Sequence, residues 1–194
     1  MKAKSLVGIC AGLILAVGAS SASALVIDLR NQGHFHGWGD YRYYHYNGGS
    51  ALQLYATGYE NGFSDREAVT RDGNGLGVNS DGDNTSQLDG TNGTEWLRFS
   101  VNRTIRLNWV DFRRYGGNDD FNVNIDGYWR RELDADPWYA NRIVYNWFAI
   151  GADHRSDEFR VARLGVTLVP EPGSIGLMLL GLIGIVLGRR FRKA

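Results

Sequence analysis

Short segments in which hydrophobic and polar residues alternate recur along the middle of the chain. Leu52 and Leu54 alternate with polar or amphipathic neighbours, and Phe121, Val123 and Ile125 alternate with asparagines. A period of two is typical of strands that bury one face. The pattern predicts strands at residues 25–30, 51–57, 95–101, 105–113, 121–129, 141–150 and 158–168.

Other stretches of the middle region predict turns, loops and irregular strands, and residues 61–71 have no clear pattern. Residues 31–49 are dense in Gly, His and Tyr and predict a loop or a broken strand, and residues 72–93 predict a polar loop except around 76–78. The apolar phase shifts between Trp109 and Val110, which predicts a β-bulge or a twist at a sheet edge. The Asp-Gly pair at 126–127 predicts a hairpin turn.

No segment of residues 25–169 has the period of a long amphipathic helix. Short strands separated by Gly, Asn and Asp turns favour an all-β fold, an antiparallel β-sandwich of jelly-roll type. A barrel is the alternative. The two ends of the sequence predict that an N-terminal signal helix and a C-terminal transmembrane helix flank this fold.

The first residues have the three parts of a secretory signal peptide. Lys2 and Lys4 precede an apolar run at residues 6–17, and the small residues Ala22-Ser23-Ala24 follow it. The sequence therefore predicts a signal peptide at residues 1–24, which export removes.

The last residues predict a short membrane anchor. Pro170 and Pro172 disfavour continuation of regular structure, so the body of the protein should end before them. Residues 173–188 are uncharged and apolar, which predicts a transmembrane helix. A basic cluster follows and would stay with the cytoplasmic headgroups and stop transfer: Arg189, Arg190, Arg192 and Lys193.

These C-terminal elements resemble a known sorting signal. The tripeptide Pro170-Glu171-Pro172, the Gly-containing apolar run and the terminal basic cluster occur in the order of the PEP-CTERM signal of Gram-negative bacteria that make exopolysaccharide. The resemblance is confined to about the last 26 residues. It implies processing by the membrane transpeptidase exosortase, a transient stay in the cytoplasmic membrane, and delivery to the cell surface or extracellular matrix. An ordinary tail anchor is the alternative.

Three domains follow: a signal peptide at 1–24, an extracytoplasmic β domain at 25–169, and the sorting signal at 170–194. The formal net charge of zero hides an acidic middle, because residues 25–169 hold 15 Arg, no Lys and 20 acidic residues, a net charge of −5. Such a domain is a poor match for the phosphate backbone, so we expect no nucleic-acid partner. The single cysteine, Cys10, lies in the signal peptide, so the exported domain has neither a disulfide nor a thiol nucleophile.

An Asp-rich segment offers oxygen ligands in a flexible, Gly-rich backbone. Calcium is bound by six to eight such oxygens, so the segment predicts a possible calcium site at Asp81, Asp83, Asn84 and Asp89. The alternative is a solvated loop in which Asp and Asn make turns. No cofactor is required on either interpretation.

Aromatic residues are concentrated in residues 25–169, which hold all six tryptophans. Flat rings can stack on the apolar faces of sugars, and we single out a Gly-rich stretch for glycan binding: Trp38, Tyr41, Tyr43 and Tyr44. Trp129, Trp138, Tyr139 and Trp147 are further candidates. The alternative is that these rings fill the core.

His34 and His36 have a spacing that places two imidazoles on one face of a strand, which a transition metal could use. No third ligand lies nearby in the sequence, so the pattern favours ordinary surface histidines. No hydrolase nucleophile elbow, metalloprotease motif or phosphate-binding loop occurs, and we expect a protein that is not an enzyme.

The sequence thus predicts an exported protein with a structural, adhesive or carbohydrate-binding role, with exopolysaccharide as a possible partner. The alternatives are a secreted carbohydrate-active enzyme and a calcium-stabilised structural domain without a glycan ligand.

Overall fold

The computed structural model describes residues 23–49, 52–80, 85–91, 93–170 and 181 of the 194-residue chain. The described strands all lie in one compact unit, Ala24–Leu168, together with a short 3-10 helix, η1 (Gly39–Tyr41). The strands are β1 (Ala24–Asp28), β2 (His34–His36), β3 (Tyr43–Asn47), β4 (Gln53–Glu60), β5 (Asp65–Asp72), β6 (Gly75–Asn79), β7 (Leu88–Asp89), β8 (Glu95–Val101), β9 (Ile105–Arg113), β10 (Phe121–Ile125), β11 (Tyr128–Leu133), β12 (Arg142–Val144), β13 (Trp147–Ala152) and β14 (Glu158–Leu168).

The two terminal helices that the sequence predicts fall outside these residues. Within the described ranges, the structure contains no helix with the length and apolar character needed to span a membrane.

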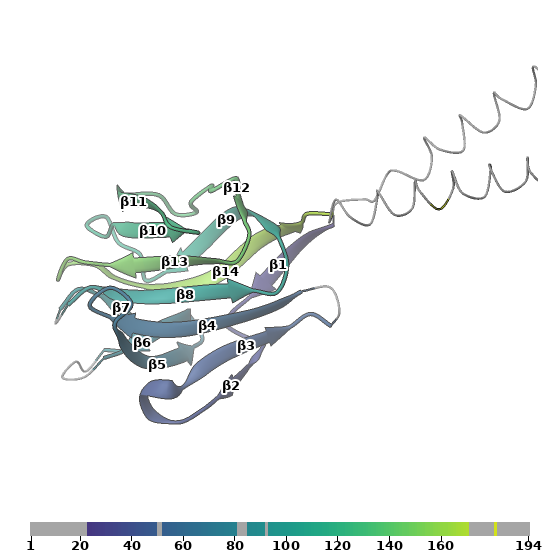
Figure 1. The fold of residues 1–194 in the computed structure, drawn as a ribbon. Coiled ribbons are helices and arrows are strands. Elements are labelled where there is room, and N and C mark those ends of the chain that lie inside the picture. Colours follow the sequence, from purple (N-terminus) through teal and green to yellow (C-terminus); the bar gives the residue numbers. More distant parts are fainter. Residues whose placement is uncertain (1–22, 50–51, 81–84, 92, 171–180, 182–194) are drawn as a thin grey trace, which may run out of the picture. The chain divides into compact units, whose positions relative to one another are not determined.

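Hydrogen bonding joins the strands into one antiparallel sheet (Figure 1). Its path runs β11-β10-β13-β8-β4-β5-β6-β14-β9-β12, with β3 and β2 added beside β4, and β1 and β7 beside β14. The sheet turns at β5, because residues 65–67 pair with β4 whereas residues 68–72 pair with β6. The all-β antiparallel prediction is confirmed. One strongly curled sheet replaces the two separate sheets expected of a jelly-roll sandwich, because β5 belongs to both halves.

The two halves of the curled sheet share one hydrophobic core. Phe112 on β9 lies 4.7 Å from Phe121 on β10 and 5.3 Å from Phe159 on β14, measured between ring centroids. Phe99 on β8 stacks on Phe148 of β13 at 4.8 Å. All five rings are fully buried. Burial of each phenyl group contributes about 2 kcal/mol, so aromatic packing across the two halves is a major source of stability.

Alternation along each strand decides which side chains enter this core. On β4, Leu54 and Ala56 are buried, and Tyr55, Thr57 and Tyr59 lie on the opposite face. A strand has this property because successive side chains point to opposite sides of the sheet.

Irregular strands and turns occur where the sequence predicts them. Residues 31–49 form β2, η1 and β3, which confirms the broken-strand alternative. The predicted bulge is confirmed as a shift in the β9–β14 register, where Gly165 pairs with Trp109 but Val166 pairs with Leu107. The pair Asp126-Gly127 has positive φ at both residues and joins β10 to β11, as the hairpin signal predicts.

A glycine at the start of β6 is required by close packing of the backbone. Gly75 has a φ of +134°, and a Cβ there would overlap the carbonyl oxygen of Val161 on β14. We expect Gly75→Ala to lower the free energy of unfolding by about 2–4 kcal/mol. Chemical denaturation of the variant measures this loss.

The matched control is Gly73→Ala, since a Cβ at Gly73 meets nothing within 4 Å. That variant should change the free energy of unfolding by less than about 0.5 kcal/mol. Equal stabilities of the two variants would contradict the packing argument.

Candidate functional site

The side of the sheet that faces away from the core carries many aromatic side chains, and we call it the outer face. Tyr55 and Tyr59 of β4 lie there, in opposite phase to buried Leu54. Trp96 of β8 pairs with Tyr59 and therefore lies on the same side. Trp147 of β13 pairs with Ser100 of β8, which is four residues from Trp96 and therefore points to the same side of the sheet. Period-two alternation thus separates a core face from an aromatic face.

Five of these rings form what we call the outer aromatic cluster: Tyr59, Phe63, Trp96, Trp129 and Trp147. Phe63, in the β4–β5 turn, lies 5.6 Å from Trp96 and 5.6 Å from Trp147 between ring centroids. Trp129 of β11 meets Trp96 edge to face at 5.1 Å. Trp96 is only 3% exposed, whereas Trp129 is 44% exposed. The cluster therefore has a buried floor and an accessible aromatic surface.

Polar groups border this cluster. The guanidinium carbon of Arg98 lies 4.5 Å from the ring centroid of Trp147, within the range of a cation–π interaction. Nε of Arg98 and Nε1 of Trp96 are shielded from solvent and have no hydrogen-bond partner among the described residues. Aromatic rings beside guanidinium donors can bind a ligand that has both apolar faces and hydroxyl groups.

The outer face continues across β2, β3 and β4 as a second group, the histidine edge: His34, His36, Tyr43, His45 and Tyr55. His45 stacks on Tyr55 with ring centroids 4.4 Å apart and an interplanar angle of 2°. His36 stacks on Tyr43 at 5.5 Å. Burial lowers the pKa of His45, and the neighbouring His36 and His34 lower it further. The neutral imidazole is therefore the favoured form of His45.

The four residues predicted for glycan binding do not form one platform. Tyr44 is fully buried, and its hydroxyl donates a hydrogen bond to the carbonyl of Gln32 at 2.6 Å, so its ring belongs to the core. Trp38 and Tyr41 are 90% and 67% exposed beside η1, and Tyr43 lies on the histidine edge.

The other aromatic residues considered for glycan binding also lie in different parts of the structure. Trp129 and Trp147 belong to the outer aromatic cluster, whereas Trp138 is packed in the core and Tyr139 is exposed. Sequence reasoning missed Phe63 and Trp96 as members of the outer aromatic cluster. Alternation around buried Leu97 could have placed Trp96 on the outer face.

Three of the predicted calcium ligands lie outside the described residues: Asp81, Asp83 and Asn84. The fourth, Asp89, is fully buried. Its carboxylate accepts hydrogen bonds from the hydroxyl of Thr85 and from the backbone N–H of Thr91. Asp89 thus stabilises the local loop, and calcium binding stays a prediction.

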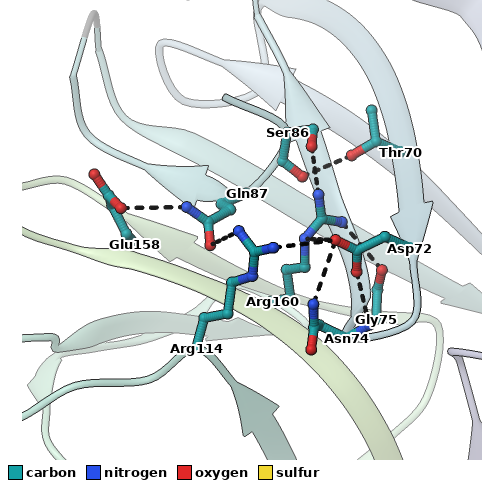
Figure 2. Close-up of polar contacts among 9 residues, drawn as sticks. All are labelled: Thr70, Asp72, Asn74, Gly75, Ser86, Gln87, Arg114, Glu158 and Arg160. Carbon is teal, nitrogen blue, oxygen red and sulfur yellow. Dashed lines mark hydrogen bonds and ion pairs between the residues drawn. The ribbon is translucent and has the colours of Figure 1, made fainter. Parts of the chain in front are cut away.

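A buried arginine next to this segment was not predicted. Arg160 of β14 is 1% exposed, and its Nε lies 3.3 Å from the carboxylate of Asp72 on β5 (Figure 2). Nη1 donates to the carbonyl of Gly75 at 3.1 Å, and Nη2 donates to the hydroxyl of Ser86. These bonds connect β14 to the β5–β6 hairpin and to residues 85–87. A buried guanidinium needs such partners to offset its loss of hydration.

A second arginine extends this network. Arg114 lies 3.7 Å from the carboxylate of Asp72 and donates to the side-chain oxygen of Gln87 at 3.3 Å (Figure 2). Gln87 in turn donates to Glu158 at 3.3 Å. These contacts are made within the protein, and only Nε of Arg160, which faces Asp72 as an ion pair, lacks a hydrogen bond among the described residues, so we assign the network to stability.

Another group of possible metal ligands lies near the start of β10. The side chains of Asp120, Glu132, Asp153 and His154 present ligand atoms within 4.8 Å of one another. Beside them, the buried carboxylate of Asp157 accepts backbone N–H bonds from Asp120 and His154. Burial and the charge of Glu132 raise the pKa of Asp120. Sequence reasoning did not bring these residues together, because Glu132 comes from β11 and the others come from two loops that are distant in the sequence.

Most of the predicted sorting motif lies outside the described residues, which include Pro170 but neither Glu171 nor Pro172. The basic residues after it also lie outside: Arg189, Arg190, Arg192 and Lys193. A family model described as the PEP-CTERM protein-sorting motif matches residues 168–193. No curated protein and no solved structure matches the chain.

The fold and the matched segment define an all-β protein with a C-terminal sorting signal. The chain carries a PEP-CTERM motif, which confirms the resemblance seen in the sequence. This motif implies export, transient membrane anchoring and processing by exosortase.

The Asp72–Arg160 pair predicts a pH dependence of stability. Burial raises the pKa of Asp72, but the backbone N–H of Asn74 and the charge of Arg160 lower it more, so the net pKa lies below 3.8. A carboxyl group with a lowered folded-state pKa stabilises the protein above its unfolded-state pKa, and this stabilisation is lost as the pH falls through the folded-state value. We therefore expect Asp72→Asn to lose more stability near neutral pH than below about pH 4.

Urea denaturation of the wild type and the variant at several pH values measures this difference. Asp65→Asn, which changes an exposed carboxylate on the same strand, is the control and should change stability little. A difference between Asp72→Asn and the wild type that stays constant with pH would contradict the prediction.

Proposed function

We propose that the β body of this exported protein binds polysaccharide at the cell surface or in the extracellular matrix, and does so without catalysis. The observation that carries the proposal is the outer aromatic cluster, which lies on the face opposite the core. Trp129 keeps 44% of its surface exposed although its neighbours are aromatic. Partly exposed aromatic groups of this kind mark interaction surfaces.

The chemistry of the cluster supports a sugar ligand. The C–H faces of a pyranose ring are apolar and flat, and they can stack on an indole ring such as that of Trp129. Hydroxyl groups at the rim of the same sugar can accept hydrogen bonds from a guanidinium, and Arg98 lies beside Trp147. A surface assembled from several rings suits a polymer, because successive sugar units can contact successive rings.

The net charge of the protein limits which polysaccharides it can bind. The region between the two terminal signals has a net charge of −5, which disfavours strongly anionic polymers. We therefore propose a neutral polysaccharide.

The test is electrophoresis of the full-length chain, purified in detergent, through gels that contain soluble neutral polysaccharides. The wild type should be retarded by at least one of them, and Trp129→Ala or Trp147→Ala should weaken binding about 5-fold, since a lost stacking contact is worth about 1 kcal/mol. Tyr139→Ala is the matched control, because Tyr139 is an exposed ring outside the cluster.

Retardation that is equal in all variants would refute the proposed surface. Chromatography of the polysaccharide after incubation separates the two candidate classes. An unchanged chain length supports binding, and shortened chains would support a secreted carbohydrate-active enzyme.

The sorting function gives a separate prediction. Deletion of residues 170–172 should leave the full-length protein in the membrane, because exosortase processing requires the motif matched at 168–193. Immunoblots of membrane and extracellular fractions measure this outcome. The control replaces Arg155 and Ser156, two exposed neighbours that lie outside the motif, with alanines. An unchanged extracellular fraction after the deletion would contradict sorting through this motif.

A further inference from the structure

Three of the four histidines of the chain lie on the histidine edge. His34 and His36 are two residues apart on β2, so their side chains point to the same side of the sheet. His45 of β3 pairs directly with His34 and is the diagonal neighbour of His36. The fold thus supplies the third imidazole that the spacing of His34 and His36 lacks in the sequence.

The spacing of one pair of these rings is close to that of two imidazoles bound to the same ion. A zinc–nitrogen bond of about 2.0–2.1 Å at tetrahedral angles places the centroids of two coordinating imidazoles roughly 5 Å apart. The ring centroids of His36 and His45 are 5.7 Å apart. The ring nitrogens of the three histidines are not gathered as a preformed ligand group in the structure, and rotations about χ1 and χ2 of the exposed His34 and His36 would bring them onto one ion.

His45 provides an independent observation. Its Nε2 atom is shielded from solvent and has no hydrogen-bond partner among the described residues. A buried polar nitrogen without a partner is costly, and a metal ion would satisfy its lone pair. The ring itself is held in place by stacking on Tyr55.

We infer that His34, His36 and His45 form a binding site for a divalent first-row transition metal ion, with zinc as the reference case. Three imidazoles leave a fourth coordination position for water or an external ligand. Nitrogen ligands favour zinc, copper and nickel over calcium and magnesium. The group at Asp120, Glu132, Asp153 and His154 is mostly carboxylate and is therefore chemically different.

The experiment is isothermal titration of the full-length chain in detergent with Zn²⁺, and absorption spectroscopy with Co²⁺ as a substitute. We expect one zinc ion per chain and visible Co²⁺ bands of a low-coordinate site. His34→Ala and His36→Ala change exposed residues and should weaken zinc binding at least about 100-fold while the fold is retained. His45→Ala should have the same effect on binding.

The matched control is His154→Ala, which removes the remaining histidine and should leave this affinity unchanged. Unchanged zinc affinity in His34→Ala and His36→Ala would overturn the inference, and so would loss of binding in His154→Ala alone. Absence of zinc binding by the wild type would overturn it as well. Polysaccharide binding through the outer aromatic cluster does not depend on this result.

Discussion

Packing of aromatic rings between the two halves of one curled sheet holds the body of this protein together. Phe112 and Phe159 come from one half and Phe121 from the other, and all three are fully buried. The exported domain has no cysteine, so no disulfide can replace this packing. The strand β5 makes the packing possible, because its two ends pair with different halves of the sheet.

The same strands produce both the core and the outer face. On β8, Leu97 and Phe99 enter the core, and Trp96 lies on the opposite side. A rigid, well-packed inner face fixes the strand positions, and strand positions fix the spacing of the outer rings. The outer aromatic cluster and the histidine edge are therefore preorganised by the core beneath them, which favours binding because little conformational entropy remains to be lost.

The buried arginine network has a different role at the turn of the sheet. Arg160 donates hydrogen bonds to the backbone carbonyl of Gly75 in the β5–β6 hairpin and to the hydroxyl of Ser86. Hydrophobic packing alone would leave such polar groups without these hydrogen bonds. Removal of Asp72 would leave a buried guanidinium with fewer anionic contacts, which is costly in a low-dielectric surrounding. Stability at this corner thus depends on polar contacts, whereas the centre of the body depends on hydrophobic burial.

Local chemistry explains what could be predicted from the sequence. Alternation in residues 95–101 and 121–125 depends on the two-residue period of a strand, and Asp126-Gly127 suits a tight turn whatever its surroundings. The C-terminal sorting signal is likewise read from contiguous residues, and the family match at 168–193 confirms it. None of these features needs a partner distant in the chain.

Contacts between distant strands could be decided only by the tertiary structure. Tyr44 looked like an exposed ring in a Gly-rich loop, but the pairing of β3 with β4 turns it into the core. Antiparallel pairing of β2 with β3 brings His45 beside His34, and the β4–β5 turn places Phe63 over Trp96. Strand alternation gives the two possible faces of each segment, and strand pairing with burial decides which face becomes core and which residues meet across it.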